Sequence, residues 1–353
     1  MTNEKTGSLY YSDYLELDKI LNSQHPRSAD LPNGADDEML FIVVHQAYEL
    51  WFKQIIHELN LVREIFSQDN INDNSGDMSN AVHKLKRIVR ILELLNHQVD
   101  VLDTMTPLDF LEFRNLLLPS SGFQSVQFRL IEAKLGLKMK QRYKADYYKH
   151  TRTGGFLQND YEKINQAEAQ STLKDLVIKW AERTPFFDKS LWSEYQSLYQ
   201  PGNNNADKFW HDYKRIYQES LSASEQGRLD ELDRVFFREG RGEFSVAAMR
   251  AVLFITLYRN LPIFHMPFEL LGVLIEIDEL LSNWRYKHLL MVRRMIGMRV
   301  GTGGTTGAGY LEGALSQHYI FKELTEMSTF LVERSRLPDL PNAVKEKTSF
   351  NVR

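Results

Sequence analysis

Apolar side chains recur at steps of three and four residues over most of this chain, which is the spacing of one face of an α-helix. The longest runs cover residues 38–66, 79–105 and 245–297, and the last of these is interrupted at residues 260–262, which include a proline. No segment alternates convincingly with the period of two that is typical of a strand. These runs therefore predict an all-α fold built as a helical bundle.

Residues 79–105 repeat as heptads, and the stripe predicts packing either inside a bundle or against another subunit. It is formed by Ala81, Leu85, Ile88, Leu92, Leu95, Val99 and Leu102. Further helices are predicted after Thr106–Pro107 to residue 119, from about residue 123 to Gly136, and over residues 166–183. Residues 137–165 predict a long loop, and residues 206–237 a charged, exposed helical pair. We expect one domain over residues 1–353, with a small helical insertion around residues 186–240.

Composition excludes several classes of protein. The formal net charge is -4 and the basic residues are dispersed, so nothing indicates nucleic-acid binding. No run of about 18 apolar residues is present, so no membrane span is expected. The first residues lack the apolar core of a signal peptide, which favours the cytoplasm.

The chain has no cysteine, which excludes disulfides, zinc held by cysteine, iron–sulfur clusters and haem bound through a thiolate. It has 10 histidines, none in a His-x-His or His-x-x-x-His pair. A compact local metal site is therefore not indicated, whereas a cofactor held by a single histidine, such as haem, is compatible.

Two histidines lie on apolar helical stripes. His288 follows Ile277, Leu281 and Trp284 on one stripe, and His45 follows Phe41 on another. A buried imidazole needs partners, so each residue is either a hydrogen-bonded core histidine or part of a pocket between helices. In the second case His288 would be an axial iron ligand, and His45 the polar group of an aromatic pocket.

Three further features carry possible functional groups. Arg114 lies four residues after Phe110 on a short apolar helix, where it would extend to solvent or bind a carboxylate bidentately. The segment 301–307 (GTGGTTG) matches neither nucleotide-binding glycine motif, so it predicts a flexible loop with hydroxyls able to close over a ligand. Arg285, Arg293 and Arg294 could meet haem propionates or form a solvated face.

Together these segments resemble the tryptophan 2,3-dioxygenase family, in the order the family has them and over nearly the whole chain. The matching stretches are residues 9–15 (LYYSDYL), 37–54 (DEMLFIVVHQAYELWFKQ), 113–114 (FR), 120–125 (SSGFQS), 127–129 (QFR), 182–185 (ERTP), 284–288 (WRYKH) and 301–304 (GTGG).

The resemblance implies a tetrameric haem enzyme that uses O2 to open the indole ring of L-tryptophan, giving N-formyl-L-kynurenine. It implies that haem b is bound through its iron by His288, and that His45 hydrogen-bonds the indole N–H. The other implied substrate contacts are Phe41, Phe110, Arg114, Thr302 and, from a neighbouring subunit, Tyr11, Tyr14 and Leu15 within an N-terminal segment 1–35. Phe110 stands where some members have tyrosine, so one carboxylate hydrogen bond would be missing.

Two alternatives stay open at this point. A related haem enzyme could oxidise another aromatic amino acid by hydroxylation. A helical haem-binding or sensing protein would need no turnover at all, but it would also have no use for a carboxylate-binding Arg114.

Overall fold

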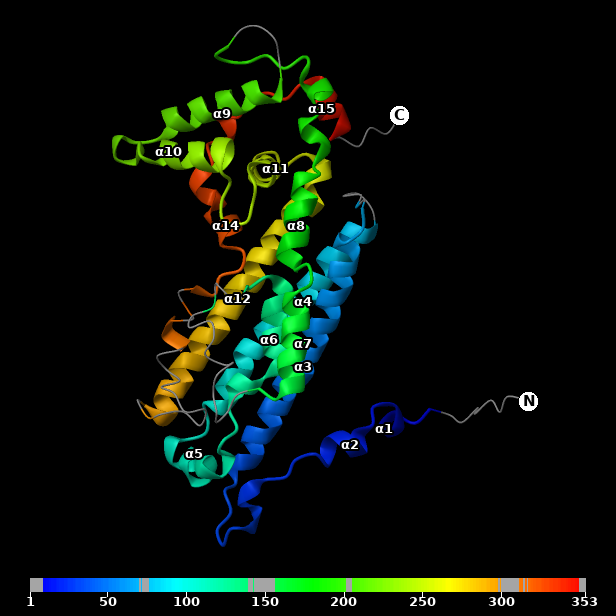
Figure 1. Ribbon diagram of the computed structural model, residues 1–353, viewed down its shortest axis with the longest axis vertical. Helices are drawn as coiled ribbons and strands as arrows, with labels where there is room; N and C mark the ends of the chain where they lie inside the picture. The colour runs from blue at the N-terminus through cyan, green and yellow to red at the C-terminus, as the bar shows by residue number, and fades with distance from the viewer. Residues whose placement is uncertain are drawn as a thin grey trace, which may run out of the picture.

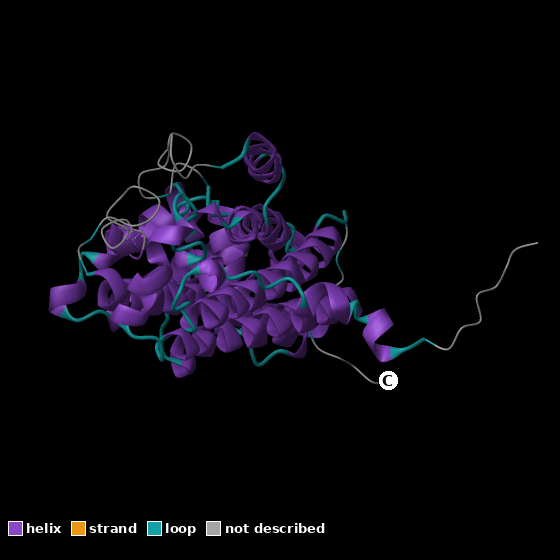
Figure 2. Ribbon diagram, turned by 90° about the horizontal axis from the view of Figure 1, so that it is seen from below, coloured by secondary structure: helices purple, strands orange, loops and turns teal. Residues whose placement is uncertain are grey.

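The computed structural model describes residues 9–69, 71, 76–138, 142, 156–200, 205–297, 299, 311–313, 315 and 317–348. Their regular secondary structure is helical, apart from one isolated bridge between Arg241 and Phe244 (Figure 2). The all-α prediction is confirmed.

Three long helices run along the length of the molecule (Figure 1). They are α3 (Asp37–Phe66), α4 (Gly76–Leu102) and α12 (His265–Ile296), and α4 packs against both of the others. The heptad stripe of α4 is buried within the chain, with Leu85 0% and Leu92 3% exposed. Of the two interpretations of that stripe, packing inside the bundle is therefore the right one.

Two shorter helices pack beside the long ones, the first of them at the end where α3 begins (Figure 1). The first, α5 (Pro107–Arg114), starts in a capping box: Asp109 N donates to Thr106 Oγ1 at 3.3 Å, and Thr106 N donates to Asp109 Oδ2 at 2.9 Å. It is shorter than predicted, because a 3-10 turn (Asn115–Leu117) follows it. The second, α6 (Val126–Leu135), packs on α3 and ends at Gly136 with φ +130°.

The predicted loop and the helix after it were partly wrong. The chain forms α7 (Gln158–Glu168), breaks at residues 169–172, and resumes as α8 (Leu173–Glu182). Only Ile164 and Ala167 of α7 are buried. Its few apolar residues therefore give too weak a helical spacing for the helix to be predicted from the sequence. Thr172 starts the new helix with a second capping box. Residues 139–141 and 143–155 of the predicted loop lie outside the described residues.

The far end of the molecule holds α9 (Ala206–Ser220), α10 (Arg228–Asp233), a π turn (Arg234–Arg238) and α11 (Val246–Leu257) (Figure 1). The prediction of an exposed, charged pair here was wrong, because α9 buries a row of large aromatic side chains. These are Phe209, Trp210, Tyr213 and Tyr217. The tyrosine hydroxyls and the tryptophan N–H make the sequence of this segment look hydrophilic, although the aromatic rings themselves are buried.

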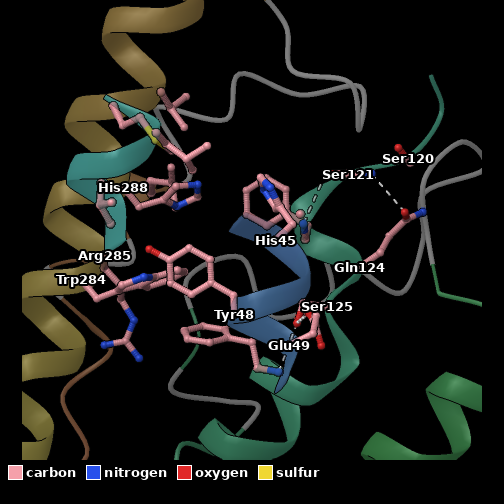
Figure 3. A pocket seen from close by; sticks show the side chains of 18 of the residues that line it. His45, Tyr48, Glu49, Ser120, Ser121, Gln124, Ser125, Trp284, Arg285 and His288 are labelled. Atoms are coloured by element: carbon pink, nitrogen blue, oxygen red, sulfur yellow. Dashed lines mark hydrogen bonds between the residues drawn. The ribbon is translucent and has the colours of Figure 1, made fainter. Parts of the chain in front are cut away.

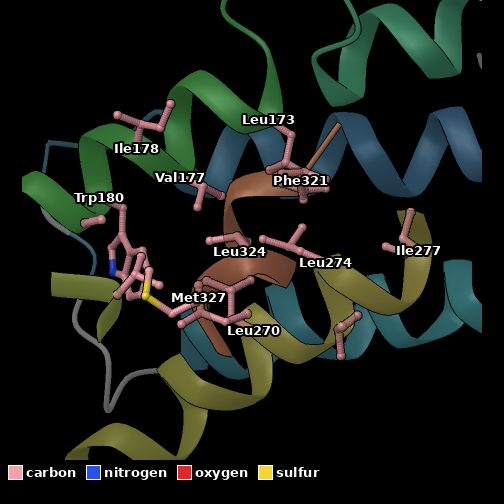
Figure 4. Packing of buried hydrophobic residues seen from close by; sticks show 14 of the residues in the cluster. Leu173, Val177, Ile178, Trp180, Leu270, Leu274, Ile277, Phe321, Leu324 and Met327 are labelled. Carbon is pink, nitrogen blue, oxygen red and sulfur yellow. The ribbon is translucent and has the colours of Figure 1, made fainter. Parts of the chain in front are cut away.

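The helices α14 (Lys322–Thr325) and α15 (Asn342–Lys347) complete this end. Leu324 and Met327 fill the space between α8 and α12, against Val177 and Leu270 (Figure 4). Further 3-10 turns occur at Arg27–Asp30, Gly122–Gln124, Pro185–Phe187, Lys189–Trp192, Ala223–Glu225, Pro262–Phe264, Glu326–Phe330 and Arg334–Arg336.

At the other terminus, α1 (Tyr11–Tyr14) and α2 (Leu17–Leu21) form an arm that leaves the body of the molecule (Figure 1). Among the described residues, no helix alone is long and apolar enough to cross a membrane. Val246–Leu257 and Pro262–Ile296 meet that test only as a pair, with a bend of 118° between them.

Candidate functional site

A cavity of about 520 Å³ lies where α3, α5, α6 and α12 meet (Figure 3). Its walls are mainly aromatic and aliphatic, a composition typical of a pocket for a largely apolar ligand. They include Phe41, His45, Tyr48, Phe52, Phe110, Arg114, residues 120–125, Phe128, Trp284, His288, Met291, Val292 and Ile296. The stripes that predicted two inward-facing histidines thus bring both to one cavity, from opposite sides (Figure 3).

His288 reaches the cavity from the C-terminal half of α12. Trp284, one turn earlier, stacks on its ring at 5.3 Å between centroids, and the Phe128 ring lies 4.8 Å from that of Trp284. Burial, together with the nearby His45, lowers the pKa of His288 to about 4, so the imidazole is neutral at pH 7. Its Nδ1 is buried with no hydrogen-bond partner among the described residues, which is unusual for a core histidine.

His45 is held in a defined tautomer. Its Nδ1 lies 2.7 Å from the carbonyl oxygen of Phe41, and because a carbonyl only accepts, Nδ1 must carry the proton. The Phe41 ring lies 4.0 Å from the imidazole, and burial lowers the pKa of His45. A neutral ring with Nδ1–H leaves Nε2 as an acceptor, able to receive an N–H from a molecule in the cavity.

The end of the cavity on α5 combines aromatic rings with one cation. Phe110 lies 5.9 Å from Phe41 and 5.4 Å from Phe113, and Arg114 lines the cavity beside them. The N-terminal capping of α5 fixes the start of the helix that carries both Phe110 and Arg114. The five predicted residues Phe41, His45, Phe110, Arg114 and His288 are therefore brought together.

Other predicted residues are not at this site. Tyr11, Tyr14 and Leu15 lie on the N-terminal arm, 71%, 69% and 37% exposed, and line no part of the cavity in their own chain. Thr302 and the rest of the segment 301–307 lie outside the described residues.

Glu49 is a cavity residue that the sequence reasoning missed. It accepts Ser125 Oγ at 2.6 Å on one carboxylate oxygen and Gln127 Nε2 at 2.8 Å on the other (Figure 3). These bonds tie residues 120–125 and the start of α6 to α3, one turn after His45. Its position four residues after His45 was a readable signal, because side chains at i and i+4 share a helix face.

A buried charged cluster at another part of the cavity wall was also missed. Glu132 is bound by Arg129 Nη1 at 2.8 Å and Arg285 Nη2 at 3.0 Å, and His318 Nδ1 lies 3.8 Å away. Burial opposes ionisation of Glu132, but the arginines around it hold its pKa well below the ordinary value. Burial lowers the pKa of His318 to about 4, so that ring is neutral.

The three arginines for which propionate contact or a solvated face was left open have protein partners of their own. Arg285 is buried against Glu132, whereas Arg293 pairs with Glu312 at 2.9 Å and Arg294 with Asp103 at 2.5 Å, both on the surface. Arg293 and Arg294 thus lie on a solvated face, whereas Arg285 does not.

Comparisons with known proteins show which sequences this chain is similar to. The sequence profile described as tryptophan 2,3-dioxygenase matches residues 1–331. A tryptophan 2,3-dioxygenase of Alteromonas mediterranea is 40% identical, with 97% of each chain covered. Those of Bdellovibrio bacteriovorus and Dictyostelium discoideum are each 39% identical, covering 98% and 97% of this chain and 99% and 88% of their own.

Proposed function

This chain belongs to the tryptophan 2,3-dioxygenase family, and we propose that its cavity holds haem b through His288 with L-tryptophan on the side of His45. The enzyme cleaves the indole C2–C3 bond of L-tryptophan with O2, and both oxygen atoms enter N-formyl-L-kynurenine. The observation that carries the site assignment is the pair of neutral imidazoles from α3 and α12 in one apolar cavity.

The residues present fit haem. A neutral imidazole is the form that binds iron. His288 is neutral, faces the cavity and has a buried nitrogen with no partner in the part of the chain that the structure describes. Among the described residues, no three His, Asp or Glu side chains are grouped to hold a bare metal ion. An iron here would therefore come with its own ligands, as it does in a macrocycle, and the apolar walls would enclose that flat ring. When bound, haem supplies the ferrous iron that activates O2.

We propose the substrate contacts as well, from the cavity geometry for His45, Phe41 and Arg114 and from the family resemblance for Thr302, which lies outside the described residues. His45 Nε2 accepts the indole N–H, and Phe41 forms the wall beside the ring. Arg114 pairs with the substrate carboxylate, and the Thr302 hydroxyl contacts the amino-acid end. Phe110 has no hydroxyl, so it contributes packing only. These contacts place the indole and exclude water, and His45 need not remove a proton because the indole N–H can persist while oxygen adds to the ring.

We further propose that the chain acts as one catalytic domain within a homotetramer in the cytoplasm. Large apolar side chains on the arm, such as Tyr11 and Tyr14, are exposed in the single chain, which supports their use against a neighbouring subunit. Tyr11, Tyr14 and Leu15 would then complete the partner's cavity. Neither hydroxylation of another aromatic amino acid nor haem binding without turnover is favoured, given the family of the chain.

The test is spectroscopic and then catalytic. After haem supplementation the protein should give the visible spectrum of a histidine-ligated haem, and His288→Ala should lose it. Reduction without air, followed by tryptophan and O2, should produce the absorbance of N-formylkynurenine in the wild type. A His288→Ala variant that keeps the unaltered histidine spectrum would refute the assignment of the iron ligand.

A further inference from the structure

A second cavity, of about 830 Å³, lies far from the first, where the C-terminal end of α3 meets α6 and α8. Arg63, on its wall, follows His45 by 18 residues on the same helix, which is about 27 Å at 1.5 Å per residue. No role described so far involves this cavity, which we call the cationic cleft. It also contains part of the 182–185 segment that the sequence shares with its family.

Four cations line the cationic cleft: Arg63, Lys134, Lys179 and Arg183. Within the described part of the chain, none of them has a carboxylate oxygen within 4.0 Å. By contrast, the cluster around Glu132 combines its buried arginines with a carboxylate.

The two more enclosed cations are held by neutral acceptors instead. Arg63 donates from Nε and Nη2 to the Ser171 carbonyl at 3.1 and 2.7 Å and from Nη2 to Gln170 Oε1 at 3.1 Å. Lys134 Nζ donates to Asn60 Oδ1 at 2.9 Å. These bonds fix both side chains and leave Arg63 Nη1 and two Nζ–H groups of Lys134 with no partner among the described residues.

Arg63 and Lys134 line the same cleft, and neither is paired with a carboxylate of a described residue. Burial lowers the pKa of Arg63, and burial together with the charge of Arg63 lowers the pKa of Lys134. The carboxylates of the cleft, Glu64, Asp69 and Glu182, are all on exposed residues at its rim. Half-buried like charges of this kind are stabilised by a bound anion.

We propose that the cationic cleft binds a phosphate or phosphoryl group between Arg63 and Lys134, with Lys179 and Arg183 adding positive charge at its edge. The planar guanidinium of Arg63 and the ammonium group of Lys134 can both donate hydrogen bonds to the several oxygens of such an anion. A second tryptophan does not suit the cleft. Phe66, the aromatic residue among the described ones that line it, is 1% exposed and offers no face for an indole.

The experiment is a calorimetric titration of the full-length protein, at constant ionic strength, with inorganic phosphate and separately with glycerol phosphate. We expect saturable one-site binding with Kd of about 1 mM or tighter. Lys134→Gln should weaken it about tenfold or more, because a charge-assisted hydrogen bond is lost. Arg63→Lys keeps the charge but not the planar guanidinium and should weaken it less.

The matched control is Lys53→Gln, which removes an exposed positive charge from the same helix and should leave binding unchanged. Tighter binding of the ester than of free phosphate would identify a phosphorylated metabolite, and the reverse would identify phosphate itself. Absence of saturable binding of either anion would overturn the proposal. So would a Lys134→Gln protein, folded by circular dichroism, that binds as tightly as the wild type. Neither result depends on haem or on tryptophan turnover.

Discussion

The active-site cavity has a neutral region and a charged region, and α12 supplies both within one turn. His288 and Arg285 are three residues apart, yet His288 is uncharged whereas Arg285 is paired with an ionised Glu132. Both regions are buried or partly buried, so burial alone does not decide which groups keep a charge. The difference lies in the neighbours: Glu132 is surrounded by cations, and His288 is surrounded by aromatic rings and another imidazole.

The charged region should be the more sensitive to a single change. Glu132→Gln keeps the shape of the side chain but leaves Arg129 and Arg285 buried without their carboxylate. We expect a loss of about 3–5 kcal/mol in the free energy of unfolding, measured by urea denaturation. The control is Glu93→Gln, which breaks the exposed Arg90–Glu93 pair and should change stability by less than about 1 kcal/mol. Equal effects of the two substitutions would contradict the comparison.

Arg114 carries a charge that lines the cavity, and we propose that this charge pairs with the substrate carboxylate. Arg114→Ala should weaken transition-state binding of tryptophan by about 2–5 kcal/mol, seen mainly as a higher KM, because a bidentate carboxylate pair is lost. An indole without a carboxylate, used as the control substrate, should be affected far less. If both substrates lose the same factor, Arg114 supports the fold of α5 and does not bind the carboxylate.

The neutral region should show the smallest effect. His45→Ala removes one neutral hydrogen bond to the indole N–H, which is worth about 0.5–1.5 kcal/mol, or roughly tenfold in kcat/KM. A general base would instead contribute roughly a factor of 10²–10⁴. Steady-state kinetics of a folded variant with normal haem content separates the two. A fall in kcat of more than about a thousandfold would mean that His45 transfers a proton.

Periodicity in the sequence predicted what lies within single helices. The stripes of α3 and α12 predicted that His45 and His288 face inward, and the Thr106–Pro107 pair predicted the start of α5. The charged cluster was out of reach, because Glu132 and Arg285 are 153 residues apart in the chain. Nothing local to either residue indicates the other. Their pairing depends on how α6 and α12 come together.

The polar character of a segment misled the prediction at the far end. Tyr213 and Trp210 of α9 have polar groups and were read as surface, but Tyr213 buries its ring and donates its hydroxyl to the Phe330 carbonyl at 2.6 Å. The carbonyl comes from a segment 117 residues later, so the compensating partner was invisible in the sequence. Local patterns show which groups need a partner, and only the fold shows which of them find one.

The hydrogen bond from His45 Nδ1 to the Phe41 carbonyl makes the tautomer of His45 independent of the side chain at position 41. The acceptor belongs to the main chain, so any residue at position 41 that keeps the helix still supplies it. The shape of the wall beside the ligand can therefore vary by substitution while the location of the imidazole proton stays the same. A lineage or a designer can adjust which indoles fit without altering the group that orients them.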